Sequence, residues 1–191
     1  MDPGGTGPID AAVRLLDGTS LSALVVGFLL SLLVGVLIAR RTSTSPILAS
    51  LTVFSVVVVA VAMLQMGRAG GGILDRNPFE HLSLGALGRC DTTVGDASAL
   101  TSNEARLNLF LYVPFGVLAT VTFGRPWRVL AIAVGLILAL EALQSILDVG
   151  VCSSLDIVTN IVGVALAIAA TVAIRRIVGR RRSRPLLDES R

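Results

Sequence analysis

The sequence predicts an all-α membrane protein, a polytopic bundle of five transmembrane helices, and three observations lead to this fold class. Of its 191 residues, 53% are hydrophobic and 15% are charged, whereas an average soluble domain has about 25% charged residues. Five nearly uncharged stretches of about 18 to 22 residues are each long enough for an α-helix to cross a hydrocarbon core of ~30 Å. Within these stretches polar and apolar residues do not alternate, as they would in a membrane β-barrel.

The five predicted helices are joined by short turns, except for a long segment between the second and the third. We expect them at residues 21–39, 46–67, 107–124, 129–147 and 155–174. The first is predicted to be retained, because the tail before it is acidic and has no convincing small-residue cleavage site. The expected parts are a flexible N-terminal tail (1–20), helices one and two (21–67), an extracytoplasmic loop (68–106), a core of helices three to five (107–174) and a basic cytoplasmic tail (175–191).

The arginines set the predicted orientation. Every basic residue except His81 is arginine, and Arg40–Arg41 and Arg125–Arg128 fall on the same side as the arginine-rich tail. By the positive-inside rule this side is cytoplasmic, so the N-terminus is expected outside and the C-terminus in the cytoplasm. We interpret the tail as a stop-transfer and anionic-lipid anchor. No nucleic-acid partner is therefore expected, despite a pI of about 9.6.

Both cysteines, Cys90 and Cys152, lie on the predicted outer side. An oxidising envelope would allow a disulfide between them, which would tie the long loop to the turn before the fifth helix. The alternative is two unrelated thiols, because the sequence does not give their separation. The chain has no CxxC motif and a single histidine, so neither a metal site nor a cofactor is expected.

Polar side chains in the last two predicted helices are the main indication of a functional site. Glu141 lies in a run whose only other polar residues are Gln144 and Ser145, and the next run carries Asp156 and Asn160 near its start. A charged carboxylate near the centre of a membrane helix costs roughly 2.5–3.5 kcal/mol on insertion scales, and such residues usually mark function. Glu141 and Asn160 are predicted to reach a similar depth in the outer half of the bilayer.

The third predicted helix contributes to the same region. Asn108 lies near its outer end, and Pro114 has no N–H to donate to the carbonyl of Phe110, which leaves a bare acceptor. Gly116 permits the close approach of a neighbouring helix or a head group. We expect an outward-opening polar pocket, formed by these groups with Glu141, Gln144, Asp156 and Asn160. The alternative is that the polar groups only hydrogen-bond one another and hold the bundle together.

The stretch from residue 108 to residue 163 resembles the VanZ-like family of bacterial membrane proteins. Three pieces carry the resemblance. They are NLFLYVPFG, with Asn108, Tyr112, Pro114 and Gly116; EALQ, with Glu141 and Gln144; and DIVTNIVG, with Asp156, Asn160 and Gly163. Their order and spacing together are fairly specific. The chain departs from the family at Gly150, where members usually carry arginine; Arg106 could substitute for that cation from the third helix.

The resemblance implies a multi-pass protein of the bacterial cytoplasmic membrane. The family is named for a member associated with teicoplanin resistance. It implies that the partners are membrane lipids, a lipid-linked envelope precursor or a glycopeptide antibiotic. It does not imply a chemical reaction, since the molecular activity of the family is not settled.

Three functions of different classes are consistent with these observations. The first is a non-enzymatic protein that binds a lipid, a lipid-linked intermediate or a lipoglycopeptide in the outer pocket. The second is an enzyme that acts on lipid head groups with Glu141 as general acid or base, although no nucleophile is clearly paired with a base. The third is a small proton-coupled carrier. Against the carrier, the polar groups lie in the outer half, with none on the inner half of helices three to five to complete a path.

Overall fold

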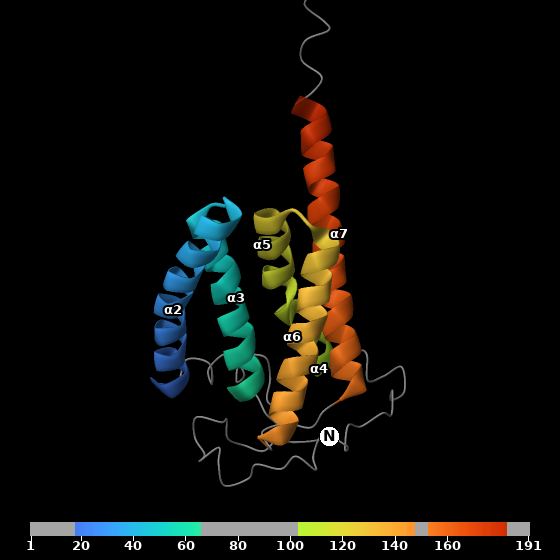
Figure 1. The fold of residues 1–191 in the computed structure, drawn as a ribbon. Helices are drawn as coiled ribbons and strands as arrows, with labels where there is room; N and C mark the ends of the chain where they lie inside the picture. Colours follow the sequence, from blue (N-terminus) through green and yellow to red (C-terminus); the bar gives the residue numbers. More distant parts are fainter. Residues whose placement is uncertain (1–17, 66–102, 148–152, 183–191) are drawn as a thin grey trace, which may run out of the picture.

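The structure is a computed structural model that describes residues 18–65, 103–147 and 153–182, and in this part of the chain its elements are all α-helices. The helices run up and down along the bundle, with α4 and α5 following each other in one direction (Figure 1). They are α2 (Gly18–Thr42), α3 (Pro46–Gln65), α4 (Asn103–Leu111), α5 (Val113–Phe123), α6 (Pro126–Ile146) and α7 (Ser154–Arg182). The predicted all-α fold is confirmed.

Five spans in the described residues are long and apolar enough to cross a membrane, as the sequence predicts. Helices α4 and α5 together make one of them, Ala105–Phe123. The last helix differs from the expectation, because α7 continues to Arg182, beyond residue 174 where we expected the span to end. Arginine is a good helix former, so the helix continues through the basic residues after the apolar run ends.

The break between α4 and α5 lies at Tyr112. This residue has φ −92° and ψ −1° and directly precedes α5, which carries Pro114 in its first turn. Proline has no backbone N–H and interrupts the helical hydrogen bonds at this point. The helix resumes at once, since the N–H of Gly116 donates to the carbonyl of Tyr112 at 2.9 Å. The third span is therefore one membrane crossing made of two helical pieces.

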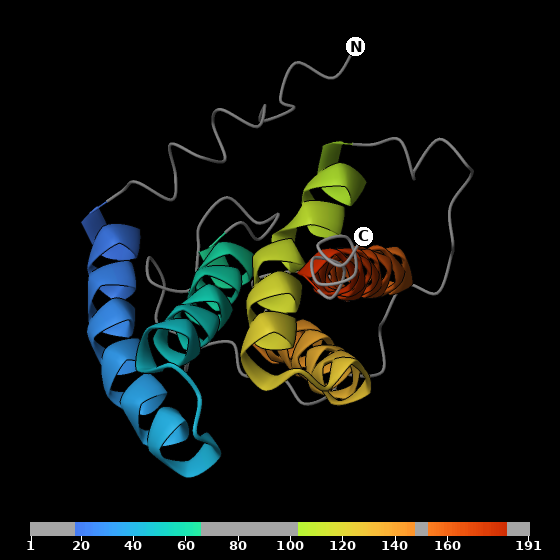
Figure 2. The ribbon, with the colours of Figure 1, turned by 90° about the horizontal axis from the view of Figure 1, so that it is seen from above.

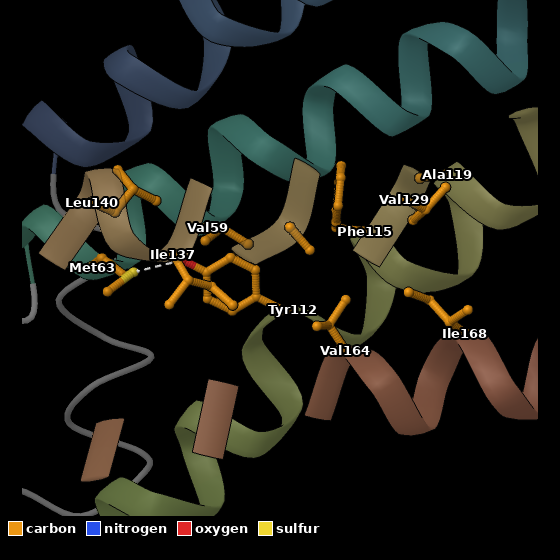
Figure 3. Packing of buried hydrophobic residues seen from close by; sticks show 11 residues of the cluster. Val59, Met63, Tyr112, Phe115, Ala119, Val129, Ile137, Leu140, Val164 and Ile168 are labelled. Carbon is orange, nitrogen blue, oxygen red and sulfur yellow. Dashed lines mark hydrogen bonds between the residues drawn. The ribbon is translucent and has the colours of Figure 1, made fainter. Parts of the chain in front are cut away.

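Helix α7 is the centre of the packing. It contacts α4, α5 and α6, while α3 packs against α5. Helix α2 lies at the edge of the bundle and packs chiefly on α3 (Figure 2). The residues between these helices form one apolar cluster, with Tyr112 and Ile137 fully buried inside it (Figure 3). The junction of α4 and α5 thus lies in the core, at the point where α3, α6 and α7 meet.

The contact between α2 and α3 is made by small residues. Gly27, Ser31, Gly35 and Ala39 recur every four residues along α2, and all four are buried. A Cβ added at Gly35 would fall on the backbone of Ser50 in α3. Such small residues let membrane helices approach closely. The larger side chains of α2, including those of its leucines, are exposed on the outside of the bundle, where they would face lipid.

Glycines also set the approach of the third span to α7. A Cβ added at Gly163 would fall on the carbonyl group of Leu109 in α4. A Cβ added at Gly116 would come within 3.1 Å of the side chains of Val164 and Ala167. Backbone therefore lies almost directly against backbone where α4 crosses α7, and this crossing tolerates no side chain at position 163.

The ends of the helices that carry the arginines lie together. Arg40 and Arg41 end α2, Arg125 and Arg128 lie at the turn into α6, and Arg175 lies on the matching part of α7 (Figure 1). The side of the membrane that this end faces stays a prediction. Cys90 and Cys152 lie outside the described residues, so their disulfide also stays a prediction.

Replacing Gly163 by alanine is expected to lower the free energy of unfolding by about 1–3 kcal/mol, because the new methyl group meets the Leu109 backbone. Gly135→Ala is the matched control, since a Cβ there meets nothing within 4 Å. At that position alanine should be neutral or add roughly 0.5–1 kcal/mol. Unfolding of both variants in mixed detergent micelles measures the difference. Equal stability of the two variants would contradict the close crossing.

Candidate functional site

Asn108 and Asp156 form a polar contact between α4 and α7. The side-chain amide of Asn108 donates a hydrogen bond to Oδ1 of Asp156 over 2.7 Å, in a partly buried position. Both residues lie on the side of the Leu109–Gly163 crossing away from the arginines, and the crossing brings their backbones near enough for these short side chains to meet. The sequence placed the two residues in one region, and the structure brings them into direct contact.

Glu141 is buried on α6 near this pair. Only 2% of its surface is exposed. Its carboxyl group receives a hydrogen bond from the backbone of Ser153 and interacts electrostatically with Asp156 and Tyr112. Its Oε2 atom has no hydrogen-bond partner in the described part of the chain. One oxygen of this carboxyl group is therefore left to accept a hydrogen bond from a group outside the described residues.

Asn160 lies one helical turn after Asp156 on the same face of α7, and it is completely buried. Neither its amide nitrogen nor its carbonyl oxygen has a hydrogen-bond partner among the described residues. Leaving a buried donor or acceptor unpaired costs about 1–3 kcal/mol. Of the four buried side-chain atoms without such a partner, three belong to Asn160 and Glu141. Unmet hydrogen-bonding capacity is thus concentrated at this end of the bundle.

Gln144 is directed toward α3. Its amide nitrogen donates to the backbone carbonyl of Met63 over 2.6 Å. The hydroxyl of Tyr112 donates to the sulfur atom of the same Met63 over 3.1 Å (Figure 3). Carbonyls in the last turn of a helix have no intrahelical partner, so Gln144 caps the end of α3. We assign Gln144 and Tyr112 to holding α3 against the bundle.

Three predicted site residues shape the backbone. Pro114 is exposed on the outer surface of α5, where it contributes the break in the third span. Gly116 and Gly163 are buried at the two crossings with α7. None of the three presents a polar side chain to a ligand. Their place in the family pattern is explained by the path of the third span.

Polar groups also lie in the other half of the bundle, which corrects the expectation that this half has none. Thr52 and Thr122 are buried, and their hydroxyl groups lie 3.1 Å apart between α3 and α5. Each hydroxyl can also donate its single proton to a carbonyl of its own helix, over 2.8 Å for Thr52 and 2.7 Å for Thr122. Arg175 donates to the carbonyl of Thr120 at the end of α5 over 3.0 Å. These groups join helices, and because threonine is common in apolar helices it did not stand out in the sequence.

Among the hydroxyl groups near Glu141, that of Thr159 is not an activated nucleophile. The hydroxyl group of Thr159 is buried and donates to the carbonyls of Leu155 and Asp156, so it is engaged with its own helix. The arrangement instead combines a carboxyl group with an unpaired amide, which suits binding of hydroxyl, amide or ammonium groups. Gly150, at the place where the family usually has arginine, lies outside the described residues.

The profile of the VanZ/LLP1 family matches residues 26–175, from the first third of α2 to the arginines of α7. The match therefore extends the resemblance of the sequence motifs to the first two spans. No curated protein and no solved structure shows significant similarity to the chain.

A double-mutant cycle of Asn108→Ala and Asp156→Ala is expected to give a coupling free energy of about 0.6–2 kcal/mol, the range measured for hydrogen bonds between membrane helices. Asn108→Ala combined with Gln144→Ala is the control, because these residues have different partners and should be additive within about 0.5 kcal/mol. Unfolding in mixed micelles measures both cycles. The contact would be refuted if the first coupling were no larger than the second.

Proposed function

Because the chain belongs to the VanZ/LLP1 family, we propose that it is a non-enzymatic membrane protein that binds the polar part of a lipid-anchored molecule. The site is the polar end of α4, α6 and α7, with Asn108, Glu141, Asp156 and Asn160. We place it in the outer leaflet of a bacterial cytoplasmic membrane, on the side away from the arginines. The proposed ligands are a membrane lipid, a lipid-linked envelope intermediate or a lipoglycopeptide such as teicoplanin.

The observation that carries this proposal is the set of unpaired polar atoms on Glu141 and Asn160. If these residues only joined helices, their donors and acceptors would be used between helices, as those of Asn108 and Gln144 are. Their burial would then cost free energy without any return. A ligand that supplies one donor and one acceptor to Asn160, and a donor to Glu141, would remove this cost. The same interactions would hold the ligand in place.

The charges of the site favour some head groups over others. Glu141 and Asp156 interact electrostatically with each other, so two carboxyl groups already share one region. A bare phosphate placed between them would be repelled. Sugar hydroxyls, peptide amides and ammonium groups would instead donate to the carboxyl oxygens. The sugar and peptide portion of a lipoglycopeptide or of a lipid-linked precursor therefore fits this chemistry better than a simple phospholipid head group.

The enzymatic alternative, with Glu141 as general acid or base, needs a nucleophile or a positioned water molecule. The hydroxyl of Thr159, beside Asn160 on α7, is bonded to backbone carbonyls. The proton-coupled carrier needs a polar path into the other half. The buried hydroxyls of Thr52 and Thr122 are each bonded to their own helix and to one another. No observation on this site favours either function over binding.

Teicoplanin susceptibility of a strain that lacks the gene tests the proposal. Complementation with the wild-type gene is expected to restore the minimal inhibitory concentration, whereas Glu141→Gln and Asn160→Leu should leave the strain as susceptible as the deletion. The first change replaces the carboxyl group by an amide of nearly the same size, and the second removes the unpaired donor and acceptor. Membrane levels of each variant are measured in parallel, with Gly135→Ala as the control that should complement fully.

If both variants are present at normal levels and complement fully, the buried polar atoms have no role in function and the proposal is wrong. If deletion does not change susceptibility, the link to lipoglycopeptides is refuted for this chain. Binding of a lipid-linked envelope intermediate is then tested with the same variants, by their ability to retain radiolabelled lipid-linked precursor in detergent. Retention of the precursor by the wild type and its loss in Glu141→Gln would support the site.

A further inference from the structure

A groove lies between α6 and α7 at the end of the bundle that carries the arginines, away from the proposed site. Its volume is about 500 Å³, within the range of ~300–1,000 Å³ typical of small-molecule pockets. The first turns of α6 form one wall and the last half of the α7 span forms the other. Its lining includes Trp127 and Leu130 of α6 and Ala165, Ala169, Ala173 and Arg176 of α7.

The walls of the groove suit a hydrocarbon chain. Apart from Arg176, the lining side chains are apolar or aromatic, and three alanines on α7 leave the space open. Trp127, Ala169 and Ala173 are exposed on the outer surface of the bundle. Because both helices are membrane spans, this surface meets acyl chains rather than water. An acyl chain can therefore enter the groove sideways from the surrounding leaflet.

The rim of the groove suits a negative charge. Arg176 is part of the lining, and the guanidinium of Arg128 lies 5.1 Å from the centre of the Trp127 ring. The preceding Arg175 is directed to another helix, since it donates to the carbonyl of Thr120. Arg176 thus stays available at the groove itself. Tryptophan and arginine commonly lie at the level of lipid head groups. The depth of the rim therefore matches that of a lipid head group, and its positive charge suits an anionic one.

We propose that this groove binds one anionic glycerophospholipid, with an acyl chain between α6 and α7 and the phosphate at Arg176 and Arg128. Basic pockets between membrane helices are known to take anionic lipid head groups. This lipid differs in place and chemistry from the ligand proposed for the site at Glu141 and Asp156, where two carboxyl groups disfavour phosphate. Its role would be to hold α6 against α7, the two helices that carry Glu141 and Asn160.

The single tryptophan of the chain is a direct probe, because Trp127 lines the groove. The purified full-length protein is placed in phosphatidylcholine bilayers that contain a small fraction of phosphatidylglycerol. In separate samples, one of the two lipids carries bromine atoms on its acyl chains, and these atoms quench tryptophan fluorescence on contact. We expect stronger quenching by brominated phosphatidylglycerol than by brominated phosphatidylcholine at the same mole fraction. Arg176→Gln should lower the relative affinity for phosphatidylglycerol about fivefold, the effect of one arginine at the membrane surface.

Two matched controls separate the groove from general surface charge. Ala169→Leu fills the groove and should reduce quenching by brominated phosphatidylglycerol, whereas Ala170→Leu, an exposed neighbour outside the lining, should not. Arg41→Gln removes a charge at the same end but on α2, and it should leave the preference unchanged. Equal quenching by both lipids in the wild type would overturn the proposal. So would equal effects of Arg176→Gln and Arg41→Gln, or an unaltered preference in Ala169→Leu.

Discussion

The close crossing of the third span over α7 is the constraint on which the rest of this structure depends. At Gly163 the α7 backbone meets the Leu109 carbonyl without an intervening side chain, and Gly116 repeats this approach further along. Within a bilayer no hydrophobic force drives helices together, so close packing and interhelical hydrogen bonds must do so. The break at Tyr112 lets one span follow α7 with both of its pieces, α4 and α5.

The polar residues divide into two groups by the use of their side chains. One group is used between helices: Asn108 reaches Asp156, and Gln144 reaches the end of α3. Glu141 and Asn160 are more deeply buried, and they retain atoms that these contacts do not use. Some polar residues of the motif therefore hold helices together, whereas others keep polar atoms that a ligand can use. The family pattern combines residues that build the site with residues that we propose to contact a ligand.

Much of the fold follows from the lengths of the apolar stretches, because a membrane helix must satisfy its backbone internally and needs about 20 residues to cross. The end of α7 does not follow, since arginine ends an apolar run without ending a helix. The common region of Asn108, Glu141, Asp156 and Asn160 could be predicted from depth alone. The direction of Gln144 could not, because its partner Met63 lies on a helix placed only by tertiary packing.

Other features needed the three-dimensional arrangement as well. The four-residue spacing from Gly27 to Ala39 is visible in the sequence, but only the packing shows that α3 is its partner. The buried hydroxyl pair of Thr52 and Thr122 depends on the contact between α3 and α5. The groove beside Trp127 forms because the small alanine side chains of α7 leave space next to α6. Periodicity and composition do not contain that information.

The central claim is that Glu141 and Asn160 are completed by a bound molecule, and native mass spectrometry of the protein released from its own membrane tests it most directly. The account predicts that a molecule is bound to the wild type. Arg176→Gln should retain this molecule, since that residue belongs to the groove. The double variant Glu141→Gln with Asn160→Leu should lose it. A wild-type protein without any bound species, or a double variant that keeps the same species, would contradict it.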